Sequence, residues 1–389
     1  MKIKIQQGIT VPKVRAVTVI EQMSVFVFLL FTLWARIWDH SQISLTVASI
    51  LLSVAGVIGI SKMILDQNKR CLLYFLFLIC SWLSVFLLRF GDIFYDFVDM
   101  ANTLFFWGIA YILLTTKTNY KLYRLLFYIV ALYFFVEIII LKRPIRGLLA
   151  DGNSYNYISC FMIFYFAVYA FSLLKDGKFP GYIDSFILVT VIIFSYGRGG
   201  IVSAVIYLVG FIFISLNKNK TRLFLYLFLG SSLLFVFVYW DQIMELLLSD
   251  KNFGKFVIYG FNSNGRSNIW GTFLCNSTSN VINFVAGADP REILEDGNLH
   301  NSFLQMWAAM GFIFFTVNII LLIICIVKKT KEKNWYYLLI LGTFLVRAFF
   351  DKMMYRWYGE ILFYFCFIDM FVMNYKEHDI TVQKHNVTK

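Results

Sequence analysis

The chain is a succession of apolar stretches of about 18 residues, the length that matches the roughly 30 Å hydrocarbon core of a bilayer. A helix satisfies its own backbone hydrogen bonds, so it is the structure that such a stretch adopts in lipid. Hydrophobic residues make up 60% of the 389 residues and charged residues only 15%, which excludes a soluble globular composition. The sequence therefore predicts an all-α, polytopic membrane protein.

About twelve transmembrane helices are expected. Their predicted ranges are 17–35, 43–61, 71–88, 97–115, 123–141, 157–174, 182–196, 200–216, 222–240, 302–327, 335–349 and 357–373. The first span follows a basic N-terminus without a small-residue cleavage site, so we expect it to stay as a signal anchor. Nine helices then occupy 1–240, a large extracytoplasmic loop 241–300, three helices 301–374 and a cytoplasmic tail 375–389.

The basic residues are divided unequally between the two sides of the membrane. With both termini cytoplasmic, 22 of the 35 Lys and Arg lie on the inner side, as the positive-inside rule requires. The net charge of +12 therefore follows from membrane orientation and does not indicate a nucleic-acid partner. On the outer side, nine of the thirteen basic residues are Arg. Guanidinium grips phosphate or carboxylate in a bidentate manner, so this bias predicts an anionic ligand there, unless the arginines only anchor at headgroups or pair with outer acids.

A tight outer hairpin, Ser195-Tyr-Gly-Arg-Gly-Gly200, joins the seventh and eighth spans. Arg198 is expected beside the outward-facing N-terminus of a helix, where free N–H groups and the helix dipole favour an anion. Gly199 and Gly200 let a bulky group approach the backbone. The alternative is that the glycines only permit the turn.

The long outer loop provides two further candidates. Arg266 follows a turn and opens a short helix, and the segment 281–287 is expected to be extended. Ser302-Phe-Leu-Gln305 has the form of a capping box, so the tenth span is expected to start there. His300 lies just before this cap, where a helix N-terminus disfavours the imidazolium, so we expect a neutral base. The alternative is a loop histidine that is hydrogen-bonded to a neighbour.

Ionisable residues near the outer ends of other spans extend the candidate set. Glu137 lies about one turn inside the fifth span, where an ionisable group is a functional candidate, with Arg143 as its alternative partner. Arg347 is either a second anion contact or the partner of Asp351. The candidate diphosphate ligands are Arg143, Arg146, Asn153, Asn156, Gly199, Gly200, Asn301, Arg347 and Arg356, and the candidate acids are Glu137, Asp289 and Glu292. Metal-ligand spacing is missing from the sequence, so neither a metal nor a cofactor is expected.

Three motifs in this order resemble the O-antigen ligase/polymerase family of bacterial membrane proteins. They are Ser195-Tyr-Gly-Arg-Gly-Gly200, Asn264-Gly-Arg-Ser-Asn-Ile-Trp270 and Leu299-His-Asn-Ser-Phe-Leu-Gln305, and the similarity covers about 145–315, with a weaker match at Gly152-Asn-Ser-Tyr-Asn156. Gly197 departs from the commoner Ser-x-Ser-Arg-Gly form of the hairpin. The resemblance implies metal-independent, inverting glycosyl transfer in a GT-C-like membrane fold. By motif, it implies functional roles for Arg198, Arg266 and His300.

Such proteins use sugar chains on undecaprenyl diphosphate at the outer face of the bacterial cytoplasmic (inner) membrane. We expect a polymerase of lipid-linked repeats for O-antigen (lipopolysaccharide) or capsular polysaccharide, with lipid-linked oligosaccharide as donor and acceptor. Membrane lipid is the surrounding partner, and a chain-length regulator protein is a further candidate. His300 is expected to be the base, with Asp289 or Glu292 as substitutes, and the arginines to stabilise the diphosphate.

Three alternatives remain. The first is a ligase that moves the chain to lipid A core. The second is a flippase or other transporter, although such proteins place charged groups at the midplane and show internal repeats, whereas the ionisable residues here lie near the ends of the spans. The third is a scaffolding membrane protein, which leaves the arginine bias unexplained.

Overall fold

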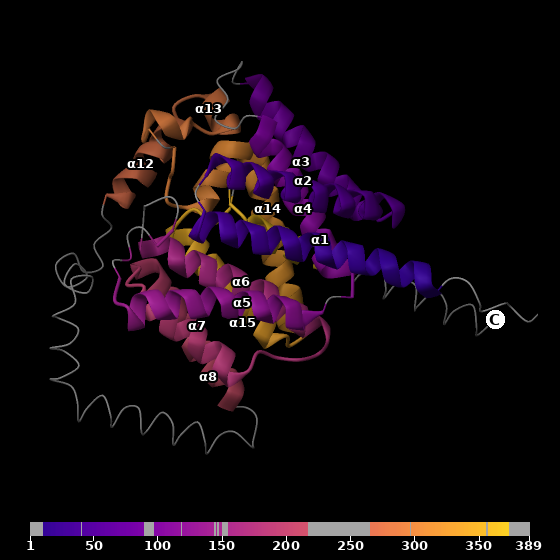
Figure 1. Ribbon diagram of the computed structural model, residues 1–389. Coiled ribbons are helices and arrows are strands. Elements are labelled where there is room, and N and C mark those ends of the chain that lie inside the picture. The colour runs from indigo at the N-terminus through magenta and orange to yellow at the C-terminus, as the bar shows by residue number, and fades with distance from the viewer. Residues whose placement is uncertain are drawn as a thin grey trace, which may run out of the picture.

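The computed structural model describes residues 11–39, 41–88, 97–117, 119–143, 145, 148–149, 155–216, 265–295, 297–354 and 357–372. These residues form helices and contain no strand (Figure 1). The α-helices are α1 (Val11–Ile37), α2 (Gln42–Leu65), α3 (Lys69–Leu88), α4 (Phe97–Thr115), α5 (Tyr120–Phe134), α6 (Tyr155–Lys175), α7 (Tyr182–Phe194), α8 (Arg198–Leu216), α12 (Arg266–Ser277), α13 (Val281–Ala286), α14 (Ser302–Lys331) and α15 (Trp335–Phe350). A π-helix, η1 (Phe135–Ile140), continues α5, a 3-10 turn, η2 (Pro290–Glu292), follows α13, and a last helix covers 360–372.

The helices have the length and surface of a membrane-embedded protein. Eight of the described helices are long and apolar enough to cross a bilayer, whereas α7 and α15 are shorter. Large apolar side chains such as Ile43, Leu73 and Phe213 are at least two-thirds exposed, as expected where lipid replaces water. The all-α membrane class is confirmed. A helix occurs at each expected span except 222–240, which lies outside the described residues, so the number twelve stays a prediction.

Helix α6 forms the centre of the bundle. Of its membrane-length window, 89% is buried inside the protein, against 28–50% for the other long helices. It packs against α5, α7, α8 and α15, and Phe171 stacks on Phe365 of the last helix with ring centroids 4.9 Å apart. Because α6 is covered on all sides by protein, both of its ends are fixed relative to the rest of the bundle.

Buried polar side chains join helix ends on one side of the bundle. Glu21 of α1 accepts hydrogen bonds from Lys62 of α2 at 3.1 Å and from Thr116, just after α4, at 2.6 Å. Asp184 near the start of α7 pairs with Arg124 near the start of α5 at 3.0 Å. An alternating up-and-down path places all these ends on the same side, so the contacts agree with the order of the spans.

One local expectation beside the tenth span is wrong, and the tenth span contains a break. The segment 281–287 is largely helical, because Asn280 caps α13 by accepting from the Asn283 N–H at 2.8 Å, and this overrides the strand preference of Val and Ile. The tenth span is interrupted, since Gly311 has φ 84° and ψ 166° inside α14. A Cβ on Gly311 would lie 2.8 Å from the Val285 carbonyl oxygen, so glycine lets α13 pack against the break.

A close crossing of α2 and α4 depends on glycine. A Cβ on Gly59 would lie 1.9 Å from the carbonyl oxygen of Gly108, which is backbone and cannot move aside.

We expect Gly59→Ala to lower the free energy of unfolding by about 1–3 kcal/mol, as overpacking does, measured by thermal unfolding in detergent. Gly342→Ala in α15 is the matched control, because it meets nothing within 4 Å. It should leave stability unchanged or raise it by up to about 1 kcal/mol through helix propensity. Equal melting temperatures for the two variants would contradict the close crossing.

Candidate functional site

The site is organised around one buried carboxylate. Asp351 follows the last residue of α15 and is 2% exposed. Its Oδ1 lies 3.4 Å from Nδ1 of His300, and its Oδ2 lies 3.1 Å from Nη2 of Arg347 and 3.9 Å from Nη2 of Arg266. Residues from α12, the segment before α14 and the end of α15 therefore meet at a single acidic group.

The Ser302 hydroxyl holds the backbone of Asp351 against the start of α14. Ser302, the first residue of α14, donates from Oγ to the Asp351 carbonyl oxygen at 2.8 Å. The same Oγ accepts from the backbone N–H of Met353 at 2.7 Å and of Met354 at 3.2 Å. Ser302 is completely buried, so these bonds hold the start of one helix against the chain that leaves another.

The expected capping box at Ser302 is wrong. Asn301 caps α14 instead, because its Oδ1 accepts from the backbone N–H groups of Phe303 at 2.9 Å and Leu304 at 3.1 Å. Gln305 turns to the preceding segment, where its Oε1 accepts from the Leu299 N–H and its Nε2 donates to the Gly297 carbonyl, both at 3.1 Å. The Asn301 oxygen is therefore occupied by the helix cap, and the role of Asn301 as a diphosphate ligand stays a prediction.

His300 is held in a strained backbone conformation. Its φ is +50°, a region that non-glycine residues rarely adopt, and the Asn298 Oδ1 accepts from the His300 N–H at 2.9 Å. Strain of this kind persists where surrounding bonds impose it and is concentrated at functional sites. The imidazole side chain is 34% exposed. One ring nitrogen thus faces Asp351 while part of the ring stays accessible.

Arg266 and Arg198 are each the first residue of a helix. Arg266 opens α12 after Gly265, whose φ is +80°, and Trp270 of the same helix donates to the Leu299 carbonyl oxygen at 2.8 Å. Burial lowers the pKa of Arg266, and the like charges of Arg347 and Arg198 act in the same direction against the attraction of Asp351. Arg198 directly precedes Gly199, whose Cβ position is 3.3 Å from Arg347 Nη1, so the start of α8 lies beside the site.

Three helix N-termini accompany these charges. α8 starts at Arg198, α12 at Arg266 and α14 at Ser302. Free backbone N–H groups and helix dipoles make each such end favourable for an anion. Arg266 and Arg347 both face Asp351, and with Arg198 at the adjoining start of α8 the balance of charge is positive.

Arg347 is a buried support and not a surface contact. It is 0% exposed, and its Nε donates to Ser159 Oγ at 2.9 Å. Its Nη2 donates to the Asn156 carbonyl oxygen at 2.8 Å as well as to Asp351. Arg347 Nη1 has no hydrogen-bond partner in the described part of the chain. Of the two predicted roles, pairing with Asp351 is confirmed, and Asn156 contributes through its backbone.

Gly199 and Gly200 permit helix packing. A Cβ on Gly199 would lie 2.9 Å from Phe350 Cβ and 3.3 Å from Arg347 Nη1, and one on Gly200 would lie 2.5 Å from Ser159 Cβ. Protein side chains already fill the space that a ligand was expected to use. The glycines bring the start of α8 against α15 and α6, and a direct contact of Gly199 or Gly200 with substrate is not supported.

Other predicted residues lie apart from Asp351 or outside the described residues. Glu137 pairs with Arg143 at 3.0 Å, which is the alternative that the sequence offered. Asp289 caps η2 and pairs with Arg291 at 2.5 Å, and Glu292 is exposed on η2. Arg143, Glu137 and Asp289 are thus engaged in ion pairs, and the roles predicted for them and for Glu292 stay predictions. Arg146, Asn153 and Arg356 are not among the described residues.

The charge state of Asp351 follows from its neighbours. Burial opposes ionisation, but the His300 hydrogen bond and the charges of Arg347 and Arg266 outweigh it and hold the pKa of the carboxyl well below its usual range. Asp351 is therefore an anion at neutral pH. It orients His300 and Arg266 and leaves their accessible faces for a ligand.

Sequence reasoning placed Asp351 and Arg347 in one outer cluster but did not assign Asp351 a role in the site, and it missed Ser159. The signal for Asp351 was its spacing of four residues from Arg347, which puts both on one helical face.

Comparison of the chain with protein-family models, curated proteins and solved structures finds no match.

Removing the Asp351 charge should destabilise the protein. We expect Asp351→Asn to lower the free energy of unfolding by about 3–5 kcal/mol, because buried cations lose their partner. Glu292→Gln is the control, and it should change stability by less than about 0.5 kcal/mol. Chemical denaturation in detergent measures both. A loss for Asp351→Asn no larger than for Glu292→Gln would exclude a central role for this carboxylate.

The stability difference between the wild type and Asp351→Asn should depend on pH. The folded pKa of Asp351 is depressed, so its stabilisation is fully present above the unfolded value of about 3.9 and is lost as the pH falls towards the folded value. The stability difference between the wild type and Asp351→Asn should therefore be constant from pH 7 to about 5 and shrink at lower pH. A difference that grows on acidification would contradict the assignment.

Proposed function

We propose that the protein is a polymerase of undecaprenyl-diphosphate-linked oligosaccharide repeats at the outer face of the bacterial cytoplasmic membrane, as the resemblance to the O-antigen ligase/polymerase family implies. One observation carries the proposal. Arg198, Arg266 and His300 belong to three separate motifs. Arg266 and His300 lie 3.9 and 3.4 Å from the Asp351 carboxylate, and Arg198 directly precedes Gly199, which packs beside Arg347. Short motifs that match by chance have no reason to meet at one place. The accessible members of the cluster are also the three motif residues.

The arginines suit a diphosphate leaving group. In the proposed reaction the bond between the anomeric carbon and a diphosphate oxygen breaks, and negative charge develops on that oxygen. Arg266 remains 21% exposed, and Arg198 is partly exposed, so both guanidinium groups are accessible. Charge-assisted bonds from two guanidinium groups at helix N-termini stabilise this charge in a preorganised site.

His300 suits the role of general base. With the Nδ1 proton directed to Asp351, Nε2 is free to take the proton from the acceptor hydroxyl. The hydroxyl oxygen attacks the anomeric carbon on the face opposite the diphosphate, so the configuration inverts. Asp351 then stabilises the imidazolium, as the buried acid of a hydrolase triad does. Asp351 and Arg347 are positioning residues in this scheme, because their burial keeps them from the substrate.

His300→Ala should abolish chain extension in cells while the protein level stays normal. The expected loss of transfer rate is about 10²- to 10⁴-fold, the usual contribution of a general base. Surface polysaccharide on a gel measures it, and a single repeat on the anchor is the expected pattern. Glu292→Gln, on the exposed η2 turn, is the control and should give a wild-type ladder. A wild-type ladder from His300→Ala would exclude the histidine as base.

Gene deletion separates the classes of activity. Loss of a polymerase leaves a single repeat on the anchor, loss of a ligase leaves long unattached lipid-linked chains, and loss of a flippase leaves no exported sugar. We expect the first pattern, and either of the others would contradict the proposal.

Alanine substitutions test the role of the two arginines against a control arginine of the same loop. Arg266→Ala and Arg198→Ala should each reduce polymerisation by about 10²- to 10³-fold, the cost of removing one preorganised donor from a developing oxyanion. Arg291→Ala is the control, because Arg291 lies in the same loop and pairs on the surface with Asp289. Transfer between purified lipid-linked repeats in detergent measures the rates. Equal effects of Arg291→Ala and Arg266→Ala would indicate that loop charge alone matters.

A further inference from the structure

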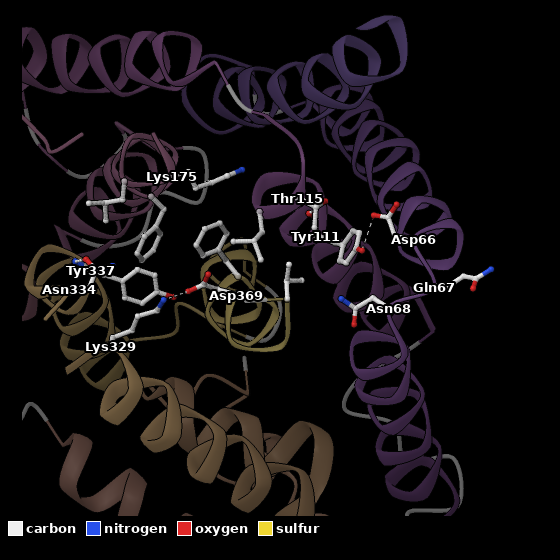
Figure 2. A pocket seen from close by; sticks show the side chains of 15 residues that line it. Asp66, Gln67, Asn68, Tyr111, Thr115, Lys175, Lys329, Asn334, Tyr337 and Asp369 are labelled. Atoms are coloured by element: carbon white, nitrogen blue, oxygen red, sulfur yellow. Dashed lines mark hydrogen bonds and ion pairs between the residues drawn. The ribbon is translucent and has the colours of Figure 1, made fainter. Parts of the chain in front are cut away.

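Figure 2 shows the side chains that line a cavity of about 500 Å³. The α2–α3 turn, the ends of α4, α6 and α14, the start of α15 and the last helix border it. Ser159 contacts the candidate site and Lys175 lines the cavity, and they lie near opposite ends of α6, whose 21 residues span about 30 Å. The cavity is therefore separate from the cluster around Asp351.

Charged groups of both signs line the cavity. On one wall Lys329 Nζ lies 2.7 Å from Asp369 Oδ2, and both side chains are buried. On the facing wall the Tyr111 hydroxyl donates to Asp66 Oδ2 at 2.9 Å, and Asp66 is exposed (Figure 2). Lys175 is also exposed. Two lysines and two aspartates balance, so the cavity as a whole favours a ligand that carries both charges over one with a net charge.

Lys175 is fixed although its residue is exposed. Its ammonium donates to the carbonyl oxygens of Leu113 at 2.5 Å and Thr116 at 2.7 Å, at the end of α4. Asp66 is likewise oriented by Tyr111. A cation and an anion held in this way form a preorganised pair of contacts, and the entropy lost when a ligand binds them is small.

The remaining lining is part apolar and part uncharged polar, with Gln67, Asn68 and Asn334 among the polar residues. Phe171, Leu174 and Phe365 form part of the wall. Lys175 ends one candidate membrane span, and Lys329 is near the end of another. Lysines at span ends mark the interface where lipid headgroups lie. The volume is within the range of about 300–1,000 Å³ that is typical of small-molecule sites.

We propose that this cavity binds the headgroup of a zwitterionic phospholipid, with the lipid ammonium at Asp66 and the lipid phosphate at Lys175. The apolar side chains contact the first part of the acyl chains. This binding does not depend on the proposed sugar transfer, because none of the lining residues belongs to the site around Asp351. A failed lipid experiment therefore leaves the proposed polymerase untouched, and the reverse also holds.

Native mass spectrometry of the full chain in detergent tests the proposal with phosphatidylethanolamine and phosphatidylglycerol of identical acyl chains. The wild type should bind phosphatidylethanolamine more tightly. Asp66→Asn should weaken that binding about tenfold, the loss expected for one charge-assisted hydrogen bond. Asp176→Asn is the matched control, since Asp176 is exposed in the turn after α6 and does not line the cavity. It should bind as the wild type does.

Two substitutions test Lys175, of which Lys175→Arg keeps a cationic donor for the α4 carbonyl oxygens. Lys175→Arg keeps the positive charge and should retain binding within about twofold, whereas Lys175→Gln should lose about tenfold. Size-exclusion profiles and melting temperatures identify any misfolded variant, in which case Asp66→Asn decides alone. Equal binding of the two lipids, or wild-type binding by Asp66→Asn, overturns the proposal. A several-fold rise in binding after removal of 375–389 also overturns it, because the chain itself would then be the occupant.

Discussion

The carboxylate of Asp351 is the group on which one end of the helix bundle depends. It is almost completely buried, and it faces Arg347, Arg266 and His300 from three separate segments of the chain. A buried charge is tolerated only where partners and hydrogen bonds compensate for the lost hydration. The approach of these segments is therefore set by electrostatics as well as by packing. The Ser302 hydroxyl adds a second link through the backbone of the same residue.

Arg347 connects the core of the bundle to the site around Asp351. Its guanidinium joins Asp351 to Ser159 and to the Asn156 carbonyl at the start of α6, the most buried of the long helices. Gly199 and Gly200 bring α8 close enough to fill the space beside Arg347 and Ser159. Arg198, the first residue of α8, is thereby placed on the same framework. Functional side chains are positioned accurately when the groups behind them are locked in this way.

Hydropathy predicted the membrane helices well, because the thickness of the bilayer fixes the length of each apolar stretch. The motif order also indicated that Arg198, Arg266 and His300 belong together. What the sequence did not contain was the direction of each side chain. Whether Arg347 meets solvent or protein, and whether Gly199 faces a ligand or a helix, depends on contacts between distant segments. The break at Gly311 was hidden for the same reason, since it lies where α13 packs closely against α14.

The two ends of the bundle differ in their charge and therefore in the ligands that they favour. At the Asp351 end of the bundle, Arg266 and Arg347 face one carboxylate and Arg198 lies at the adjoining start of α8, and such an excess of positive potential favours a polyanion such as a diphosphate. In the cavity at the other end, Lys175 and Lys329 are balanced by Asp66 and Asp369. Each end of the bundle therefore disfavours the kind of ligand that the other end favours. α6 and α15 run between them, so the two sites are held apart by the same helices that form them.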